Sequence, residues 1–411
     1  MTFNTSPMPG APPGSMPATG ATAVGATGMS TVRHAEAALM GRDPDTALAL
    51  LDQAEATQPG VEVCMTRAVA WRMKGDLPRA IEALSNALAF EPYNFVALLT
   101  RGLLRHDAGQ HAEAALDCGN ALKIAPAPER IPQGLRVQVE RARTIVDTWR
   151  EALRAHLKAA IEPLKGEFPS QRWERLDESL DIYCGIRRAF VQEPLLFTLP
   201  RLPAIPFHDR DAFPWLGELE AATDTIRAEC ERALEQASEA FAPYIAYPPD
   251  APVNQWGELN HSRRWSSYFL WNCGTRQDEA CAACPETTAL LERLPMQDQP
   301  GFAPTAMFSA LEPRTHIPPH TGSANTRLLV HLPLILPGPA RFRVGNEERT
   351  WRMGEAWVFD DSIEHEAWND ADALRVILIF DIWNPLLSEG ERALITAMMR
   401  ARSSFGSAKG I

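Results

Sequence analysis

The sequence predicts an α + β protein, in which a helical N-terminal part precedes a C-terminal sandwich or barrel of short strands. Two observations predict this fold class. Small residues recur with a 34-residue period between residues 31 and about 130, and short apolar runs separated by turn residues follow one another from about residue 264. The first pattern is typical of stacked helix pairs, and the second is typical of a β-sandwich or barrel.

The composition is that of a globular protein long enough for two or three domains. The 411 residues are 45% hydrophobic and 22% charged, with a formal net charge of −12. No long basic run is present, so nucleic acid is not expected as a partner. No stretch of about 18 consecutive apolar residues exists, so no membrane span is expected. Residues 1–30 lack the pattern of a secretory signal, and they predict a disordered leader on a cytoplasmic protein.

Paired helices are expected in the first domain, residues 31–165. The residues that recur are Ala68, Gly75, Ala80, Leu84, Ala87 and Pro92, matched 34 positions later by Gly102, Gly109, Ala114, Cys118, Ala121 and Pro126. Small side chains let two helices approach, and the proline ends the second helix of each pair. The pattern resembles the tetratricopeptide repeat, whose copies stack and usually bind peptides or partner proteins. A purely structural spacer is the alternative. Residues 131–165 predict a long capping helix.

A helical connector and a proline-rich linker are expected over residues 166–210. Residues 168–200 are expected to be helical as far as the segment Leu199–Phe207, which contains three prolines and predicts an extended chain. The C-terminal domain, residues 211–411, is expected to begin with one helix over residues 211–243. Strands are then expected at WSSYFLW, TAMFSALEP, TRLLVHLPLIL, RFRVG, ERTWRM, AWVFDD, HEAWND and RVILIFDIW. A last helix is expected to begin with a capping box formed by Ser388 and Glu391.

Two histidines in the β-region are candidates for metal binding. His320 stands just before a strand, and His365 begins another strand 45 residues later, so both can point into one barrel. Two imidazoles suit Fe(II), Zn or Cu. The carboxylate that usually completes a non-haem iron site would stand two residues after the first histidine, but that position is Gly322.

An arginine and a third histidine belong to the same region. Arg375 lies on the next strand after the second candidate ligand, and an inward-facing guanidinium is costly unless it meets an anion such as a carboxylate. A structural ion pair with Asp372 is the alternative. Strand alternation places His331 on one face with Arg327 and Leu329. Together these residues predict a site for a dicarboxylate bound to iron.

Residues from about 200 to 390 resemble the aspartyl/asparaginyl β-hydroxylase family, which depends on Fe(II) and 2-oxoglutarate. The runs that carry the resemblance are HTGSANTRLLVHLPLILP, VGNEERTW, FDDSIEHEAWND and IFDIWNP, with LPAIPFHDRDAFPWL and WSSYFLW upstream. The resemblance implies a double-stranded β-helix (jelly-roll) fold for an oxygenase domain over residues 211–411. It also implies a dioxygenase, with O2 as cosubstrate, that hydroxylates the β-carbon of an aspartyl or asparaginyl residue or a related substrate. The repeats would recruit that peptide or protein.

The resemblance implies that His320 and His365 are the iron ligands. Characterised members of the family use two histidines, with water in place of the carboxylate that is missing at Gly322. The open position could also admit a halide, as it does in some halogenases, although the family hydroxylates with the same gap.

The resemblance also implies roles for the other candidates. Ser309 and Arg375 would hold the distal carboxylate of 2-oxoglutarate, and His331 would contact the carboxylate nearer the iron. Arg327 and Leu329 are the candidate substrate contacts. Animal members carry an arginine at the position of Leu329, where it meets the acidic side chain of the substrate. This departure leaves the substrate open, so a lipid-linked acyl group is an alternative target, and a catalytically inactive oxygenase-like scaffold is an alternative function.

Overall fold

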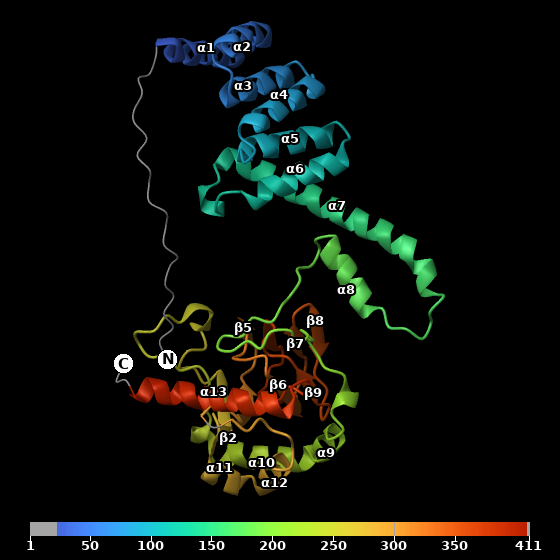
Figure 1. The fold of residues 1–411 in the computed structure, drawn as a ribbon, viewed down its shortest axis with the longest axis vertical. Helices are drawn as coiled ribbons and strands as arrows, with labels where there is room; N and C mark the ends of the chain where they lie inside the picture. Colours follow the sequence, from blue (N-terminus) through green and yellow to red (C-terminus); the bar gives the residue numbers. More distant parts are fainter. Residues whose placement is uncertain (1–22, 300, 409–411) are drawn as a thin grey trace. The chain divides into compact units, whose positions relative to one another are not determined.

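The structure is a computed structural model that describes residues 23–299 and 301–408, and it contains two compact units (Figure 1). Unit 1 is Met1–Ile186 and unit 2 is Arg187–Ile411. Each unit buries its own apolar core, formed by helices in unit 1 and by strands with flanking helices in unit 2. The predicted fold class, a helical N-terminal part followed by a β-domain, is confirmed.

The boundaries of the units differ from the predicted ones. Residues 1–22 of the predicted leader lie outside the described residues, whereas residues 23–30 form the start of a helix. The predicted connector, residues 166–210, is divided between the units. Its first part belongs to unit 1, and the part from Arg187 onward packs against loops of unit 2.

Unit 1 contains a row of helix pairs, in which α1 packs on α2, α3 on α4, and α5 on α6. These helices are α1 (Ala23–Met40), α2 (Pro44–Thr57), α3 (Val61–Met73), α4 (Leu77–Phe90), α5 (Phe95–Asp107) and α6 (His111–Lys123). Alanines between the helices, including Ala80, Ala87, Ala114 and Ala121, are completely buried. Their small side chains let neighbouring helix backbones approach closely.

The 34-residue period has a conformational reason. Gly75 and Gly109 follow the first helix of consecutive pairs and have φ angles of +76° and +78°, in the left-handed region that favours glycine. Gly102 on α5 lies so near α6 that a Cβ atom there would stand 2.6 Å from Cys118 Sγ. These positions recur because each pair repeats the same turn and the same crossing, as in tetratricopeptide repeats.

Two further helices complete unit 1. The predicted long helix is α7 (Gln133–Lys165), which packs on α5 and α6. The prediction that residues 168–200 are helical is wrong, because only α8 (Glu174–Tyr183) is helical there. Gly185, with φ +72°, follows that helix, and the chain beyond is extended because its N–H groups bond to loops of unit 2.

Two antiparallel sheets that face each other form the centre of unit 2. The larger sheet has the strand order β1-β2-β4-β11-β6-β9, with β3 paired to β2, and the smaller has the order β5-β10-β7-β8. From β4 to β11 the chain passes back and forth between the sheets, as in a double-stranded β-helix or jelly roll. The strands are β1 (Ala242–Pro243), β2 (Trp265–Asn272), β3 (Thr275–Arg276), β4 (Ala306–Leu311), β5 (Thr315–His320), β6 (Arg327–Ile335), β7 (Ala340–Val344), β8 (Glu347–Thr350), β9 (Trp357–Phe359), β10 (His365–Asn369) and β11 (Arg375–Trp383).

Every strand that the sequence predicted is present, but β5 and the two-residue strands β1 and β3 were not predicted. The six-residue β5 is the longest of these three. It contains Pro318 and Pro319, which cannot donate to a strand ladder. β5 forms the edge of the smaller sheet, where proline is tolerated because one side of the strand needs no partner. His320 therefore ends a strand instead of standing before one.

Helices cover the outer face of the larger sheet (Figure 1). They are α9 (Leu216–Ala221), α10 (Thr223–Gln236), α11 (Asp278–Ala283) and α12 (Pro285–Leu291). The prediction of one helix over residues 211–243 is wrong, because α9 and α10 are separated at Ala222. Near the end of α9, the Glu220 carboxylate accepts a hydrogen bond from the Ala356 N–H (2.7 Å) and pairs with Arg210 (2.7 Å).

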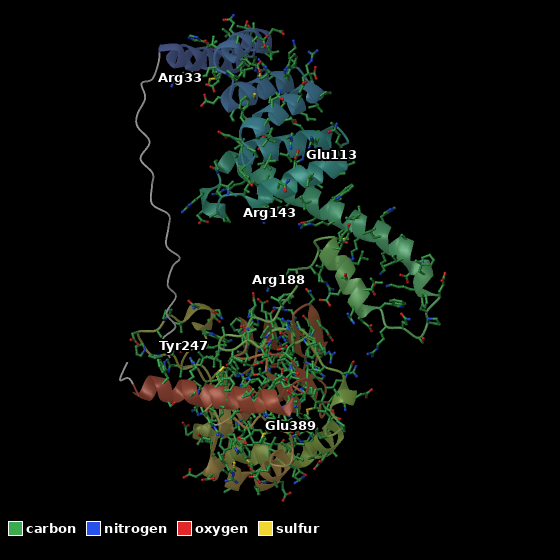
Figure 2. All side chains as sticks on the ribbon, viewed as in Figure 1. Arg33, Glu113, Arg143, Arg188, Tyr247 and Glu389 are labelled. Atoms are coloured by element: carbon green, nitrogen blue, oxygen red, sulfur yellow. The ribbon has the colours of Figure 1, made fainter. Side chains whose placement is uncertain are left out.

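The last helix is α13 (Glu389–Ala408), and its predicted capping box is confirmed. Ser388 N–H donates to the Glu391 carboxylate (2.8 Å), and Glu391 N–H donates to Ser388 Oγ (3.3 Å). Figure 2 shows the side chains of both units on the ribbon. Among the described residues, no helix has the length and apolar character needed to cross a membrane. Short 3-10 turns are η1 (Pro128–Arg130), η2 (Arg210–Ala212), η3 (Ser238–Ala240) and η4 (Asn254–Trp256).

Candidate active site

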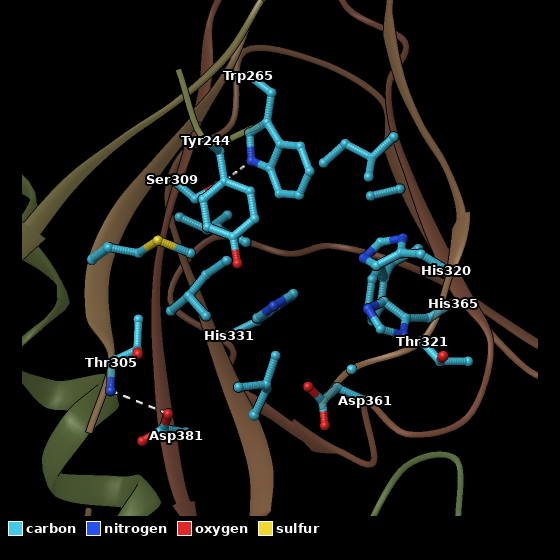
Figure 3. Close-up of a pocket in the computed structure, with 18 of the residues that line it drawn as sticks. Tyr244, Trp265, Thr305, Ser309, His320, Thr321, His331, Asp361, His365 and Asp381 are labelled. Atoms are coloured by element: carbon cyan, nitrogen blue, oxygen red, sulfur yellow. Dashed lines mark hydrogen bonds between the residues drawn. The ribbon is translucent and has the colours of Figure 1, made fainter. Parts of the chain in front are cut away.

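A cavity of about 250 Å³ lies between the two sheets of unit 2 (Figure 3). Its walls come from β5, β7 and β10 of the smaller sheet and from β2, β4, β6 and β11 of the larger one. The structure brings all of the predicted site residues to this cavity: Ser309, His320, Arg327, Leu329, His331, His365 and Arg375.

His320 and His365 face each other from neighbouring strands. They are paired in the ladder between β5 and β10, and their ring centroids are 4.1 Å apart. His320 Nδ1 lies 2.8 Å from the Pro318 carbonyl, and His365 Nδ1 lies 3.0 Å from the Ile363 carbonyl. A backbone carbonyl can only accept a hydrogen bond, so Nδ1 must carry the proton, and in the neutral ring each Nε2 keeps its lone pair. The two rings therefore present two nitrogen donors on one side of the cavity (Figure 3).

Both imidazoles are neutral at neutral pH. Burial, together with the neighbouring His365 ring, lowers the pKa of His320 to about 3. Burial lowers the pKa of His365 to about 4, although its contact with the Ile363 carbonyl acts in the opposite direction. A neutral imidazole is the form that binds a metal ion.

The Asp361 carboxylate lies beside Gly322, the position at which non-haem iron sites commonly carry a carboxylate ligand. A Cβ atom on Gly322 would overlap the carboxylate of Asp361, so a side chain at either position excludes a side chain at the other. Asp361 is buried, one of its oxygens accepts a hydrogen bond from Arg327 (3.1 Å), and the other has no protein partner. Within the described part of the chain, no group of three or more His, Cys, Asp or Glu side chains is placed to hold a metal. The protein thus offers a pair of imidazoles.

Arg375 is a buried cation without a carboxylate partner in the described residues. It is 1% exposed, and its Nε has no hydrogen-bond partner. Its guanidinium lies over the ring of Trp351, with 4.4 Å between its central carbon and the ring centroid. Burial lowers the pKa of Arg375 to about 9, so the group still carries its charge at neutral pH. The alternative partner, Asp372, pairs with Arg314 instead (2.7 Å).

Ser309 and His331 add polar atoms to the same wall. Ser309 is 1% exposed, and its Oγ accepts a hydrogen bond from Trp265 Nε1 (3.1 Å), which leaves the hydroxyl proton free to donate. His331 stands against the ring of Phe359, and its Nδ1 is buried without a partner. Burial, with the Arg375 charge nearby, lowers the pKa of His331, so this ring is neutral as well.

Arg327 differs from Arg375 because two carboxylates already hold it. Arg327 donates to Asp361 (3.1 Å) and to Asp381 (3.2 Å), both of which are buried. Burial raises the pKa of Asp381 to about 7, against the opposing effect of the Arg327 charge. Leu329, two residues along β6, adds an apolar surface to the cavity.

The model of the aspartyl/asparaginyl beta-hydroxylase family matches residues 220–385, which include all of these site residues. Residues 220–385 belong to this family. Over 199 residues, the chain is 37% identical to the ornithine lipid ester-linked acyl 2-hydroxylase of Rhizobium tropici, covering 48% of this chain and 66% of that protein. It is 36% identical over 182 residues to human aspartyl/asparaginyl beta-hydroxylase, covering 44% of this chain and 22% of that protein. The chain thus spans about two thirds of the bacterial relative and less than a quarter of the human one.

Among solved structures, the chain is similar to the Arabidopsis OM64 TPR domain. The two are 21% identical, and the match covers 29% of this chain and 98% of that one, with a TM-score of 0.26. The tetratricopeptide assignment of unit 1 rests instead on the 34-residue period and the helix pairs.

Several residues that line this cavity were not predicted from the sequence. Asp381 could have been found, because alternation along β11 places it on the same face as Arg375. Trp265 begins a predicted strand, but its bond to Ser309 depends on pairing between strands distant in sequence. Tyr244, whose hydroxyl points into the cavity in Figure 3, lies beyond a two-residue strand that gives no sequence signal.

Proposed function

We propose that unit 2 is an Fe(II)- and 2-oxoglutarate-dependent dioxygenase that hydroxylates its substrate. The observation that carries the proposal is the buried Arg375 guanidinium, left without a carboxylate partner among the described residues, in a cavity that also holds two neutral imidazoles. A charge buried without a partner is costly, and an anionic ligand would remove that cost. 2-Oxoglutarate supplies such an anion, and the imidazoles supply nitrogen ligands that suit Fe(II).

The polar atoms of the cavity fit these groups. His320 and His365 would hold Fe(II) through their Nε2 atoms, whose orientation is set by the bonds at Nδ1. Arg375 and the Ser309 hydroxyl would bind the distal carboxylate of 2-oxoglutarate, and His331 would contact the other carboxylate. Iron and 2-oxoglutarate supply the oxidising chemistry, with O2 as cosubstrate. The chain itself contributes orientation, a buried positive charge, and walls that exclude water.

Two substrates are candidates, and one observation favours the second. An aspartyl or asparaginyl residue is the target that the family name carries. A lipid-linked acyl group matches the name of the Rhizobium relative. The apolar Leu329 stands where the family resemblance implies a substrate-binding arginine, and Arg327 is already held by Asp361 and Asp381. With Arg375 occupied by 2-oxoglutarate, neither arginine of the cavity is free to meet an acidic side chain, which favours the apolar substrate.

The repeats of unit 1 would recruit a peptide or protein partner, which is a common role of stacked helix pairs. This role is independent of the choice between the two substrates, because a lipid substrate and a protein partner can bind to different units.

A succinate-release assay tests the proposed chemistry. Purified full-length protein with Fe(II), 2-oxoglutarate and O2 is expected to release succinate above the background without protein, even before the substrate is known. His365→Ala is expected to abolish this release. No release and no 2-oxoglutarate binding by the wild-type protein would leave the oxygenase-like scaffold as the function.

Substrate class is tested by two parallel assays on the same preparation. Acyl-lipid vesicles and a synthetic aspartyl peptide are incubated with the active protein, and mass spectrometry measures the addition of oxygen. We expect hydroxylated acyl chains and an unchanged peptide. Leu329→Arg is expected to reduce acyl hydroxylation, because a charge enters the apolar part of the cavity. Hydroxylation of the peptide alone would instead support the aspartyl or asparaginyl substrate.

A further inference from the structure

The segment that leads into unit 2, residues 187–199, lies outside the family match of residues 220–385. We name it the lead-in segment, and Arg188 near its start is labelled in Figure 2. Within the described chain it contains no helix or strand, yet its backbone is held by unit 2 at several points. The loops that hold it are the one that follows His320 and the one that precedes His365.

One half of the lead-in segment pairs with the loop that follows His320. Leu195 N–H donates to the Gly322 carbonyl (2.9 Å), and Leu196 N–H donates to the Ser323 carbonyl (2.9 Å). The Leu195 side chain lines the cavity although it is 65% exposed, so it stands at the mouth. This half therefore fixes the loop after the first imidazole and forms part of the cavity rim.

The other half pairs with the loop that precedes His365. Glu193 N–H donates to the Ser362 carbonyl (2.7 Å), and Gln192 forms a backbone bridge with Ile363. The Ile363 carbonyl is the group that meets His365 Nδ1 at 3.0 Å. The lead-in segment thus reaches the residue that orients the second imidazole.

The side chain of Gln192 connects the two loops. Its Nε2 donates to Asp360 Oδ2 (2.6 Å), and its Oε1 accepts from Asn325 Nδ2 (2.9 Å). Asp360 in turn accepts from the N–H (3.0 Å) and hydroxyl (2.5 Å) of Ser362, so it fixes the loop before the second imidazole. Asn325 belongs to the loop after the first imidazole and also bonds to the lead-in segment through Leu199.

Apolar packing anchors the far end of the lead-in segment. Leu196, Phe197 and Leu199 pack with Ile395 and Met399 of α13. The segment is therefore held on one side by α13 and on the other by the two loops, which restricts its freedom to move away from the cavity.

We propose that Gln192 is a positioning residue for the metal site, and that the lead-in segment is part of the active site although it precedes the family domain. Gln192 links the loop that follows His320 to the loop that precedes His365, and the two imidazoles depend on this link, as well as on the ladder between β5 and β10, to bind one ion. Partners outside the ligand shell commonly change metal affinity 10- to 100-fold when they are removed. The inference rests on the proposed metal site.

The direct test measures binding of Mn(II) to the full-length protein, from the electron paramagnetic resonance signal of the free ion. Gln192→Met keeps the size of the side chain and removes its hydrogen bonds, and we expect at least tenfold weaker Mn(II) binding. The absorption spectrum of bound Co(II) is expected to change as well, because the positions of the nitrogen donors change. Glu193→Ala is the matched control: its side chain is exposed, and we expect unchanged binding.

A charge-conserving exchange separates positioning from a loss of folding. Gln192→Glu alone places a second carboxylate beside that of Asp360 and removes the donated hydrogen bond, so it is expected to weaken Mn(II) binding. When Gln192→Glu is combined with Asp360→Asn, the amide can donate to the new carboxylate, and binding is expected to recover. All variants are compared below their unfolding temperatures.

The outcomes distinguish this inference from the proposed function. If the wild-type protein and His365→Ala bind Mn(II) equally, the proposed metal site is wrong. If only His365→Ala loses binding while Gln192→Met and Gln192→Glu bind as tightly as the wild type, the metal site stands and the positioning role of Gln192 is overturned. Weak binding by the double variant would also contradict it, because the hydrogen bond would be present without its effect.

Discussion

Two arginines on adjacent strands of one sheet show how the surroundings of a side chain decide its role. Arg327 on β6 is neutralised by Asp361 and Asp381, whereas Arg375 on β11 has no such partner among the described residues. Both arginines were predicted as site residues, because each lies on an apolar strand where its side chain can face inward. This distribution of carboxylates supports the proposed role of Arg375 in binding an anion, whereas Arg327 belongs to an ion-pair network within the protein.

The charge of Arg375 is expected to reduce stability in the absence of a ligand. We predict that Arg375→Met increases the free energy of unfolding of the ligand-free protein by about 1–3 kcal/mol, because an unpaired buried charge is replaced by an apolar side chain of similar length. Denaturant unfolding of both proteins measures this change. Ser309→Ala, which removes only a hydroxyl from the same wall, is the comparison. A less stable Arg375→Met protein would mean that Arg375 is paired within the folded chain.

The depressed pKa of His365 predicts a dependence of stability on pH. The folded protein keeps this imidazole neutral down to about pH 4, whereas in the unfolded chain it takes up a proton below about 6.5. The unfolded state therefore binds more protons between these values, and stability falls as the pH falls, by up to roughly 1.4 kcal/mol per pH unit. We expect His365→Gln to lose less stability than the wild type between pH 6.5 and 4. Equal losses in metal-free denaturant titrations would contradict the depressed pKa.

At the scale of elements, the loop after β5 and the loop before β10 share one space. Gly322 lacks a side chain. The volume that a side chain at position 322 would fill is occupied by the Asp361 carboxylate of the neighbouring loop. Because the two residues lie far apart in sequence, this relation could not be read from the motif around either one.

A double-mutant cycle tests this shared space. Gly322→Ala is expected to reduce the free energy of unfolding by about 1–3 kcal/mol, since the new methyl group displaces the Asp361 carboxylate. In an Asp361→Ala background the same substitution is expected to reduce the free energy of unfolding much less. The coupling energy between the two positions is then above about 0.5 kcal/mol. Thermal or denaturant unfolding of the four proteins provides the values. Additive effects would show that the two side chains do not compete.

Elements with a strong period could be predicted from the sequence, and elements defined by distant partners could not. Alternation along β6 correctly predicted that Arg327, Leu329 and His331 lie on one face. Arg375 on β11 lines the same cavity. Strand β5 was missed because its prolines contradict a strand unless the edge position is known. The helix expected after α8 is absent because the chain there bonds to loops more than a hundred residues later. Tertiary pairing of this kind leaves no local pattern.

At the scale of the whole molecule, each unit has its own core and its own sequence signal. The repeats were predicted by their period, and the β-domain by its motifs. The boundary was placed too late, because the extended lead-in segment belongs by its hydrogen bonds to unit 2. Loss of structure in one unit is therefore expected to leave the core of the other intact.

A substitution in unit 1 tests that independence. Gly102→Ala places a Cβ atom 2.6 Å from Cys118 Sγ and 2.9 Å from the Cys118 backbone nitrogen, so α5 and α6 must move apart. We expect the free energy of unfolding of unit 1 to fall by about 1–3 kcal/mol. Thermal circular dichroism should then show loss of helix at a lower temperature, and Mn(II) binding by unit 2 should be unchanged. Gly119→Ala, which adds a Cβ atom in ordinary contact with Val146, is the control. A parallel loss of metal binding would show that the units fold as one.

The central claim, that one cavity binds a metal and a dicarboxylate together, is tested most directly by calorimetric titration of 2-oxoglutarate into the Mn(II)-loaded full-length protein. We predict one binding site per chain in the wild type, and loss of at least 100-fold in affinity in Arg375→Met, because the buried charge that meets the carboxylate is gone. His365→Ala is expected to bind neither ion nor dicarboxylate tightly. Binding of 2-oxoglutarate with unchanged affinity by Arg375→Met, or no binding by the wild type, would contradict the assignment of this cavity.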